Sequence, residues 1–269
     1  MTMRILMAWD PDASVIIGCV ALMVAYLIVC RRDSSRVACF LLGDLIMLLA
    51  LISPLDALAD VYLFSAHMLQ HMLLVLATPP LLILGLPEVF ALAMIRVPTL
   101  GTVERLLRTP ALAWTLGMTT LWIWHLPRLY DATLVSEPLH IFEHLTFLLT
   151  ATIFWWPILA PLTASRMSHG AAFAYLGAAM LTTTVLGILI TFSPVGVFTA
   201  YLHPEDSLHV LGVLRDSWGL TTQSDQELGG LLMWVPGGLV YLGAIMAVLA
   251  RWYRAPEPEA LARTGVSHA

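Results

Sequence analysis

The sequence predicts an all-α protein, a polytopic membrane bundle of about seven transmembrane helices. Its 269 residues are 59% hydrophobic and only 12% charged, whereas soluble domains contain about 25% charged residues. The mean hydropathy is +0.84. Apolar runs close to the roughly 20 residues that a helix needs to cross a bilayer recur along the whole chain. A soluble fold would have to bury all of these runs, so composition favours a membrane protein.

The expected helices form one integral membrane domain, residues 1–254. Hydropathy places the spans near 13–30, 37–53, 61–84, 111–127, 139–160, 170–192 and 229–250. We expect the first run to be a helix rather than a cleaved signal, because Arg31 and Arg32 follow it like the flank of a stop-transfer segment. The proline- and glutamate-containing residues 255–269 are expected to form a short disordered cytoplasmic tail.

The arginines predict the orientation of the bundle. All 13 basic residues are arginine, and on this map ten of them lie on one side of the membrane and three on the other. Arginine-rich connections usually face the cytoplasm. The N-terminus is therefore expected outside and the C-terminus in the cytoplasm, with the connections 54–60, 128–138 and 193–228 facing out.

Five of the nine histidines then fall at one level near the outer face. They are His67 and His71 in the third span, His125 at the end of the fourth, and His140 and His144 at the start of the fifth. Each pair is separated by four residues, which places both imidazoles on one helix face about 6 Å apart. Ionisable groups inside a membrane are costly and usually mark function. These five histidines are the predicted metal ligands, with hydrogen-bonded packing as the alternative.

Methionines and a glutamate accompany the histidines. Met68 and Met72 form a second pair separated by four residues, and Glu143 lies inside the second histidine pair. Imidazole together with thioether suits copper, particularly Cu(I). Glu143 could orient an imidazole or accept a proton. Ordinary packing remains the alternative for both methionines, and nothing beyond membrane-helix composition distinguishes Met118 or Met233.

Further polar residues have two interpretations each. Asp44 lies in the middle of the second span, where it must face the interior, stay protonated or pair. It is either an accessory ion- or proton-handling group or a helix-to-helix hydrogen bond. Asp56 and Asp60 precede the third span and are either solvated or lead cations toward the histidines. His203 and His209, on the long outer connection, are expected to be exposed.

Prolines and cysteines add local expectations. Pro79 and Pro80 interrupt the third span, so a break is expected below the histidines, with the freed carbonyls satisfied inside the bundle. Cys19, Cys30 and Cys39 form no CxxC pattern and are expected to be packing residues.

Three sequence blocks carry a family resemblance. They are HMLQHM at 67–72 with PPLL at 79–82 and GLP at 85–87; WHLPRLYD at 124–131 with LH at 139–140, EH at 143–144 and FWWP at 154–157; and DQELGG at 225–230 with MWVPGG at 233–238. Together they resemble the CtaG family of cytochrome c oxidase assembly factors, the group tied to caa-type oxidases, over residues 53–253.

The resemblance implies a multi-pass protein of the bacterial plasma membrane that is needed to make an active haem-copper oxidase. Copper is the implied metal, and the implied partners are oxidase subunits, an extracytoplasmic or periplasmic copper chaperone and membrane lipid. The shared motif positions are His67, His71, His125, His140, His144, Asp225 and Gln226. Asp225 could be an accessory metal residue or could cap the seventh span.

Other functions remain open at the level of sequence. A haem-binding membrane electron carrier would use the imidazoles as axial ligands, and a scaffold would assist assembly without metal. A copper importer is disfavoured because only the apolar run 73–76 follows His71. No hydrolase or nucleotide-binding motif is visible, so we expect no enzyme. The absence of a basic patch with interleaved aromatics argues against nucleic acid.

Overall fold

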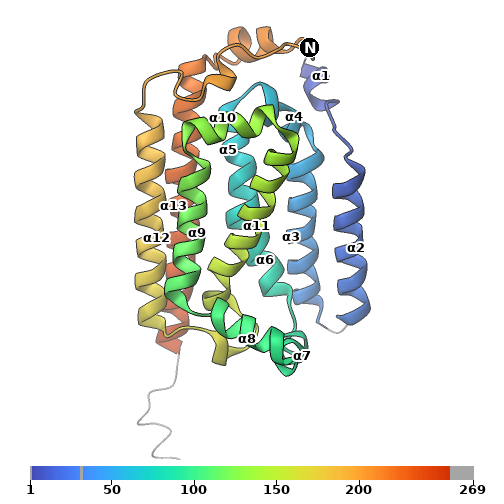
Figure 1. The fold of residues 1–269 in the computed structure, drawn as a ribbon, viewed down its shortest axis with the longest axis vertical. Helices are drawn as coiled ribbons and strands as arrows, with labels where there is room; N and C mark the ends of the chain where they lie inside the picture. Colours follow the sequence, from blue (N-terminus) through green and yellow to red (C-terminus); the bar gives the residue numbers. More distant parts are fainter. Residues whose placement is uncertain (1, 31–32, 255–269) are drawn as a thin grey trace, which may run out of the picture.

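Long helices that run side by side make up the protein (Figure 1). The structure is a computed structural model that describes residues 2–30 and 33–254, and every regular element in these ranges is helical. Five helical segments are long and apolar enough to cross a membrane. They are α3 (Ser34–Ile52), the segment Phe64–Gly85, α11 (Glu137–Leu159), α12 (His169–Thr191) and α13 (Thr222–Arg254). The prediction of an all-helical fold with several membrane helices is confirmed.

Two shorter helices occupy the remaining predicted runs. α2 (Ala13–Val29) packs against α3, and α9 (Pro110–Trp124) packs against α11 (Figure 1). The predicted tail, residues 255–269, lies outside the described residues, as do Arg31 and Arg32.

Short helices lie outside the predicted spans. They are α1 (Thr2–Leu6), α4 (Pro54–Val61), α7 (Glu88–Arg96), α8 (Pro98–Leu107), α10 (Pro127–Val135), η2 (Thr163–Ser165), η3 (Thr199–Tyr201) and η4 (Val213–Ser217). α4, α8 and α10 each begin with proline, whose fixed φ and missing N–H suit the first helical position. In Figure 1, α4 and α10 cover the end of the bundle where α1 lies, and α7 and α8 lie at the opposite end.

The third predicted span is broken below its histidines. It consists of α5 (Phe64–Met72), a π-helical turn η1 (Leu73–Ala77) and α6 (Thr78–Gly85). Pro79 has no N–H to offer the carbonyl of Val75, four residues earlier. Trp155 of α11 takes that place and donates its Nε1–H to the Val75 carbonyl at 3.1 Å. The predicted break, with the freed carbonyl satisfied inside the bundle, is confirmed.

Two glycines allow α13 to lie close to its neighbours. A Cβ at Gly229 would overlap the ring of Phe64 on α5, and one at Gly230 would overlap the hydroxyl of Thr191 on α12. Only glycine permits these approaches. The DQELGG block therefore places α13 directly against the helix that carries His67 and His71.

An aromatic cluster lies in the half of the bundle away from His67 and His71. Its defining members are Phe154, Trp155, Trp156, Tyr175 and Tyr241. The rings of Trp155 and Tyr241 stack with centroids 5.9 Å apart, and the Tyr175 hydroxyl donates to the Phe154 carbonyl at 2.8 Å. The cluster fixes α11, α12 and α13 relative to one another.

Candidate metal centre

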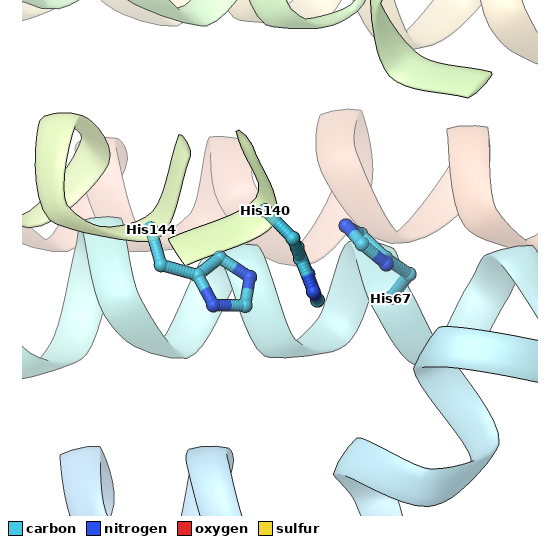
Figure 2. Close-up of side chains that lie close together, drawn as sticks. All are labelled: His67, His140 and His144. Atoms are coloured by element: carbon cyan, nitrogen blue, oxygen red, sulfur yellow. The ribbon is translucent and has the colours of Figure 1, made fainter. Parts of the chain in front are cut away.

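The five predicted histidines come together at the end of the bundle covered by α4 and α10. We call them the histidine cluster: His67, His71, His125, His140 and His144. The first two lie on α5, the last two on α11, and His125 is the residue that ends α9. Figure 2 shows how the rings of three of them, His67, His140 and His144, approach one another.

The ring distances define a compact group. The centroids are 4.2 Å apart within each of the pairs His67/His71 and His140/His144. Between the two helices, His67 lies 5.3 Å from His140 and His71 lies 5.4 Å from His144. The centroid of His125 is 6.0 Å from that of His71. The spacing of four residues therefore places each pair on the inner face of its helix, as predicted.

Two overlapping sets of donor atoms fit a single ion. One set consists of His67, His140 and His144, and the other of His67, His71 and Glu143. Within each set, one ligand atom from each residue lies within 4.8 Å of the other two. Bonds of about 2.0–2.1 Å to imidazole nitrogen place two ligand atoms at most about 4.2 Å apart. Small side-chain movements would therefore close either set around an ion.

The imidazole nitrogens are buried and unused. Both ring nitrogens of His67 and His71 lack a hydrogen-bond partner among the described residues, and so does Nε2 of the other three histidines. His67 is 0% and His71 3% exposed. A buried polar group without a partner costs about 1–3 kcal/mol. Packing histidines would be hydrogen-bonded, so the unused nitrogens fit the binding of an ion.

His125 is oriented by its own helix. Its Nδ1 lies 2.6 Å from the carbonyl of Leu121. Because the carbonyl can only accept, Nδ1 carries the proton, and Nε2 of the neutral ring keeps its lone pair. A backbone carbonyl that fixes the ring in this way is a common support for metal-binding histidines.

Glu143 lies inside the cluster. Its side chain is fully buried, and Oε1 is 3.7 Å from Nε2 of His71. Neither carboxylate oxygen has a hydrogen-bond partner in the described part of the chain. Glu143 therefore lies next to an imidazole, and its accessory role stays a prediction.

Asp60 borders the cluster on the side of α4. Its Oδ1 lies 3.7 Å from Nδ1 of His140, and the side chain is 39% exposed. Burial raises the pKa of Asp60 to about 7, and the nearby charges of Asp56 and Asp10 act in the same direction. Burial raises the pKa of Asp56 to about 6, although a hydrogen bond from Gln70 opposes the shift. The sequence named both aspartates without predicting contact with a histidine.

Asp225 caps the histidine-bearing helix. Leu63, the N-cap residue of α5, provides no side-chain acceptor. The Asp225 carboxylate accepts from the backbone N–H of Phe64 at 2.9 Å, and from the N–H and hydroxyl of Ser65 at 3.1 and 2.5 Å. α13 already begins at Thr222, so Asp225 lies inside its first turn and caps α5 instead of its own helix.

Gln70 ties α5 to the preceding helices. Its Nε2 donates to the Ala50 carbonyl at 2.9 Å and to Oδ1 of Asp56 at 2.5 Å. In α13, Gln226 donates to the Ser193 carbonyl at 3.1 Å. Gln70 therefore holds the helix that carries His67 and His71, and Gln226 joins α13 to the end of α12.

Asp44, His203 and His209 belong to neither donor set, and the methionines differ in burial. Asp44 is buried on α3, and its Oδ1 has no hydrogen-bond partner among the described residues, but it belongs to neither donor set. His203 and His209 are exposed, as expected. Met68 is fully buried, and Met72 is partly buried.

The fold and this site define a helical membrane protein with a candidate metal centre at one end of its bundle. The family model described as "Cytochrome c oxidase caa3 assembly factor (Caa3_CtaG)" matches residues 20–255. The chain belongs to this family, which confirms the resemblance of the sequence blocks. Membership in an assembly-factor family suggests a non-catalytic role.

Curated relatives are longer proteins. An uncharacterized protein of Mycobacterium leprae is 26% identical over 71% of this chain, which corresponds to 30% of that relative. An uncharacterized protein of Mycobacterium bovis is 26% identical over 93% of this chain and 40% of its own length. The chain thus spans well under half the length of these relatives. No solved structure was found to match this chain.

Proposed function

We propose that this protein assists the assembly of a cytochrome c oxidase by holding copper, as cargo, at the histidine cluster and passing it to an oxidase subunit. The observation that carries the proposal is the set of buried imidazole nitrogens without partners in one compact group. Family membership supplies the oxidase as the destination.

The donor set favours copper over hard cations. Five neutral imidazoles, with Met68 and Met72 on the same helix as His67 and His71, suit copper better than magnesium or calcium, which prefer all-oxygen sites. One carboxylate, Glu143, is close enough to complete a donor set with His67 and His71. Bound copper would be held by lone pairs that the folded chain otherwise leaves unused.

The proposed topology has seven spans. α2 and α9 would cross the bacterial plasma membrane beside the five longer segments, and the arginine distribution supports an N-terminus outside. The histidine cluster then opens toward the extracytoplasmic side, where the family resemblance implies that oxidase copper centres are loaded. Asp56 and Asp60 at this end would attract cations. The proposed partners are oxidase subunits and an extracytoplasmic copper chaperone.

Metal and haem content of the purified protein tests the proposal. After copper loading, elemental analysis should give at least one copper per chain, and the absorption spectrum should lack a Soret band. His67→Ala/His71→Ala should lose this copper, whereas His203→Ala/His209→Ala, which changes only the exposed pair, should retain it. A Soret band would favour the haem-binding carrier, and no metal in the wild-type protein would favour the scaffold.

A second measurement connects the site to oxidase assembly. In cells grown at limiting copper, His67→Ala/His71→Ala should reduce oxidase activity in membranes more than His203→Ala/His209→Ala does. Equal losses, or a loss from the exposed pair alone, would contradict the ligand assignment.

A further inference from the structure

A cavity of about 40 Å³ lies beside the histidine cluster, on the side of the aromatic cluster. Its wall includes four thioethers and two imidazoles. They are Met68, Met72, Met118, Met233, His71 and His125. Leu, Val, Phe and Tyr residues complete most of the wall.

The four methionines reach the cavity from distant parts of the sequence. Met68 and Met72 belong to α5, Met118 to α9 and Met233 to α13. Met68, Met118 and Met233 are 0%, 5% and 7% exposed. Thioether sulfur is a weak hydrogen-bond acceptor but a good ligand for soft ions. Four such groups around one small space provide a donor set that ordinary aliphatic packing would not.

The two histidines are an independent sign that this wall binds something. His71 has no partner for either ring nitrogen among the described residues, and His125 has none for Nε2. Both are at least nine-tenths buried, with 3% and 5% exposed. His71 also belongs to a donor set of the histidine cluster, so one ring borders both sites.

The size of the cavity limits its occupant. A single water needs about 10–15 Å³, so 40 Å³ admits one ion or a few waters. A porphyrin, a quinone or a lipid chain would not fit. Most of the wall is thioether and hydrocarbon, so a few waters would find polar partners only at the two imidazoles and at Thr150, Thr183 and Tyr241, whereas a soft ion would find the thioethers as well.

The charge of the wall limits the occupant further. No carboxylate lies among the described residues that line the cavity. The cost of moving an ion into an apolar interior grows with the square of its charge, and a divalent ion would meet no compensating anion. Neutral thioethers and imidazoles therefore favour a monovalent soft cation, and Cu(I) is the biological ion of that kind.

We infer that this cavity is a second copper site, selective for Cu(I), formed by thioethers together with His71 and His125. The inference rests on the proposed function, because the histidine cluster is the source of the ion. His71 connects the two positions, so Cu(I) can pass between them by exchanging one ligand at a time. The cluster would receive copper, and the cavity would hold the reduced ion away from water.

Cu(I) loading of the full-length protein in detergent, without oxygen, tests the inference. The readouts are the copper-to-protein ratio and X-ray absorption at the copper edge, which distinguishes sulfur from nitrogen neighbours. The wild-type protein should retain two Cu(I) per chain and show sulfur neighbours. Met118→Leu/Met233→Leu keeps side-chain volume and should lose one Cu(I) together with most of the sulfur signal. Met246→Leu, which changes a methionine 57% exposed on α13, should behave like the wild type.

A cluster variant separates this inference from the proposed function. Neither His67 nor His140 lines the cavity, so His67→Ala/His140→Ala should lose the nitrogen-coordinated copper and keep the sulfur signal. If Met118→Leu/Met233→Leu keeps both copper ions, or if wild-type copper has nitrogen neighbours only, the cavity site is overturned while the cluster can stand. If His67→Ala/His140→Ala keeps both ions, the cluster assignment fails instead. An unchanged unfolding temperature of the leucine variant would show that its loss of copper is not a loss of fold.

Discussion

The two halves of α11 are buried in different ways. The first half carries His140, Glu143 and His144, whose buried atoms include several without a partner among the described residues. The second half carries Phe154 and Trp155 in the aromatic cluster, where the Trp155 Nε1–H and the Phe154 carbonyl are both hydrogen-bonded. Glu143 is buried as deeply as Phe154 and Trp155, so for this residue the contrast lies in hydrogen-bond partners and not in burial. The second half therefore stabilises the fold, and the first half leaves donor atoms without a protein partner among the described residues.

The third span repeats the contrast. α5 presents imidazoles, and the prolines of α6 lie beyond the π-helical turn, where Trp155 satisfies the Val75 carbonyl. π-helical turns inside helices often accompany functional sites. Substitutions that are far apart and share no partner act independently. Variants in the two halves should therefore separate stability from metal binding, and the following predictions test that separation.

The largest expected effect is on stability, from Trp155→Ala. Truncating a buried tryptophan costs about 3–5 kcal/mol, and this one also satisfies the carbonyl freed by Pro79. The unfolding midpoint in detergent should fall strongly, while copper bound at the histidine cluster of each folded molecule stays unchanged. Trp155→Phe, which keeps a ring but removes the N–H, should lose about 1–3 kcal/mol. Trp252→Phe, at a tryptophan 54% exposed, is the control and should change little. A loss of copper from folded Trp155→Phe would break the comparison.

For His140→Ala/His144→Ala we expect a loss of copper affinity with little loss of stability. Copper affinity should fall about 100-fold, equivalent to about 2.7 kcal/mol, because two of the three members of one donor set are removed. The unfolding midpoint of the metal-free protein should change by less than about 1 kcal/mol, since removing unpaired polar atoms offsets lost packing. Competition with a copper chelator and thermal unfolding measure the two quantities. A variant that unfolds easily but keeps its affinity would show that these histidines are packing residues.

A smaller effect on both properties is expected for Asp225→Asn. The amide keeps one acceptor oxygen but loses the charge that caps α5. Loss of a helix cap costs about 1–2 kcal/mol, and displacement of α5 should weaken copper binding several-fold. Asp225→Asn should therefore lie between the Trp155 variants, which lose stability, and His140→Ala/His144→Ala, which loses copper. If it weakened copper binding as much as His140→Ala/His144→Ala without lowering stability, Asp225 would be a ligand rather than a cap. Thermal unfolding and chelator competition again provide the measurements.

Local patterns in the sequence predicted much of this arrangement. Hydropathy located the five helical segments long enough to cross a membrane, and also the shorter helices α2 and α9. The spacing of four residues placed each histidine pair on one face, and Pro79 predicted the break in the third span. Each of these features depends on neighbours within a few residues. Short helices such as α4 and α10 were not predicted because they are too brief to give a hydropathy signal.

Contacts between distant segments could not be predicted in the same way. The sequence gives the inner face of a helix but not the helix that it meets. Asp225 and Phe64 are far apart in the chain, yet they make a cap. Met118 and Met233 looked like ordinary apolar residues until α9 and α13 placed them around one cavity with His71. The proximity of Asp60 to His140 likewise depends on how α4 packs at the end of the bundle.

The smallest expected effect concerns pH at the edge of the histidine end. Burial raises the pKa of Asp56 to about 6, with the charges of Asp10 and Asp12 adding to the shift, whereas an unfolded aspartate has a pKa of about 3.9. The folded protein therefore holds this proton more tightly. The stabilisation is complete below about pH 4 and is lost as pH rises through about 6.

Asp56→Asn tests this dependence. The amide stays neutral and can still accept from Gln70, so the free energy of unfolding should fall by about 1–2 kcal/mol less between pH 4 and 7 than in the wild type, after allowance for partial solvent exposure.

The control is Asp33→Asn at the N-cap of α3. A hydrogen bond with Ser35 lowers the pKa of Asp33, so this variant should remove a stabilisation that exists only at higher pH. Unfolding midpoints of the metal-free protein across this pH range provide the measurement. Opposite slopes from the two variants would show that burial at the histidine end, and not carboxylates in general, sets the pH response. Parallel slopes would mean that α4 is solvated. The unpaired donor atoms in the first half of α11 would then be close to water, and their burial would no longer distinguish them.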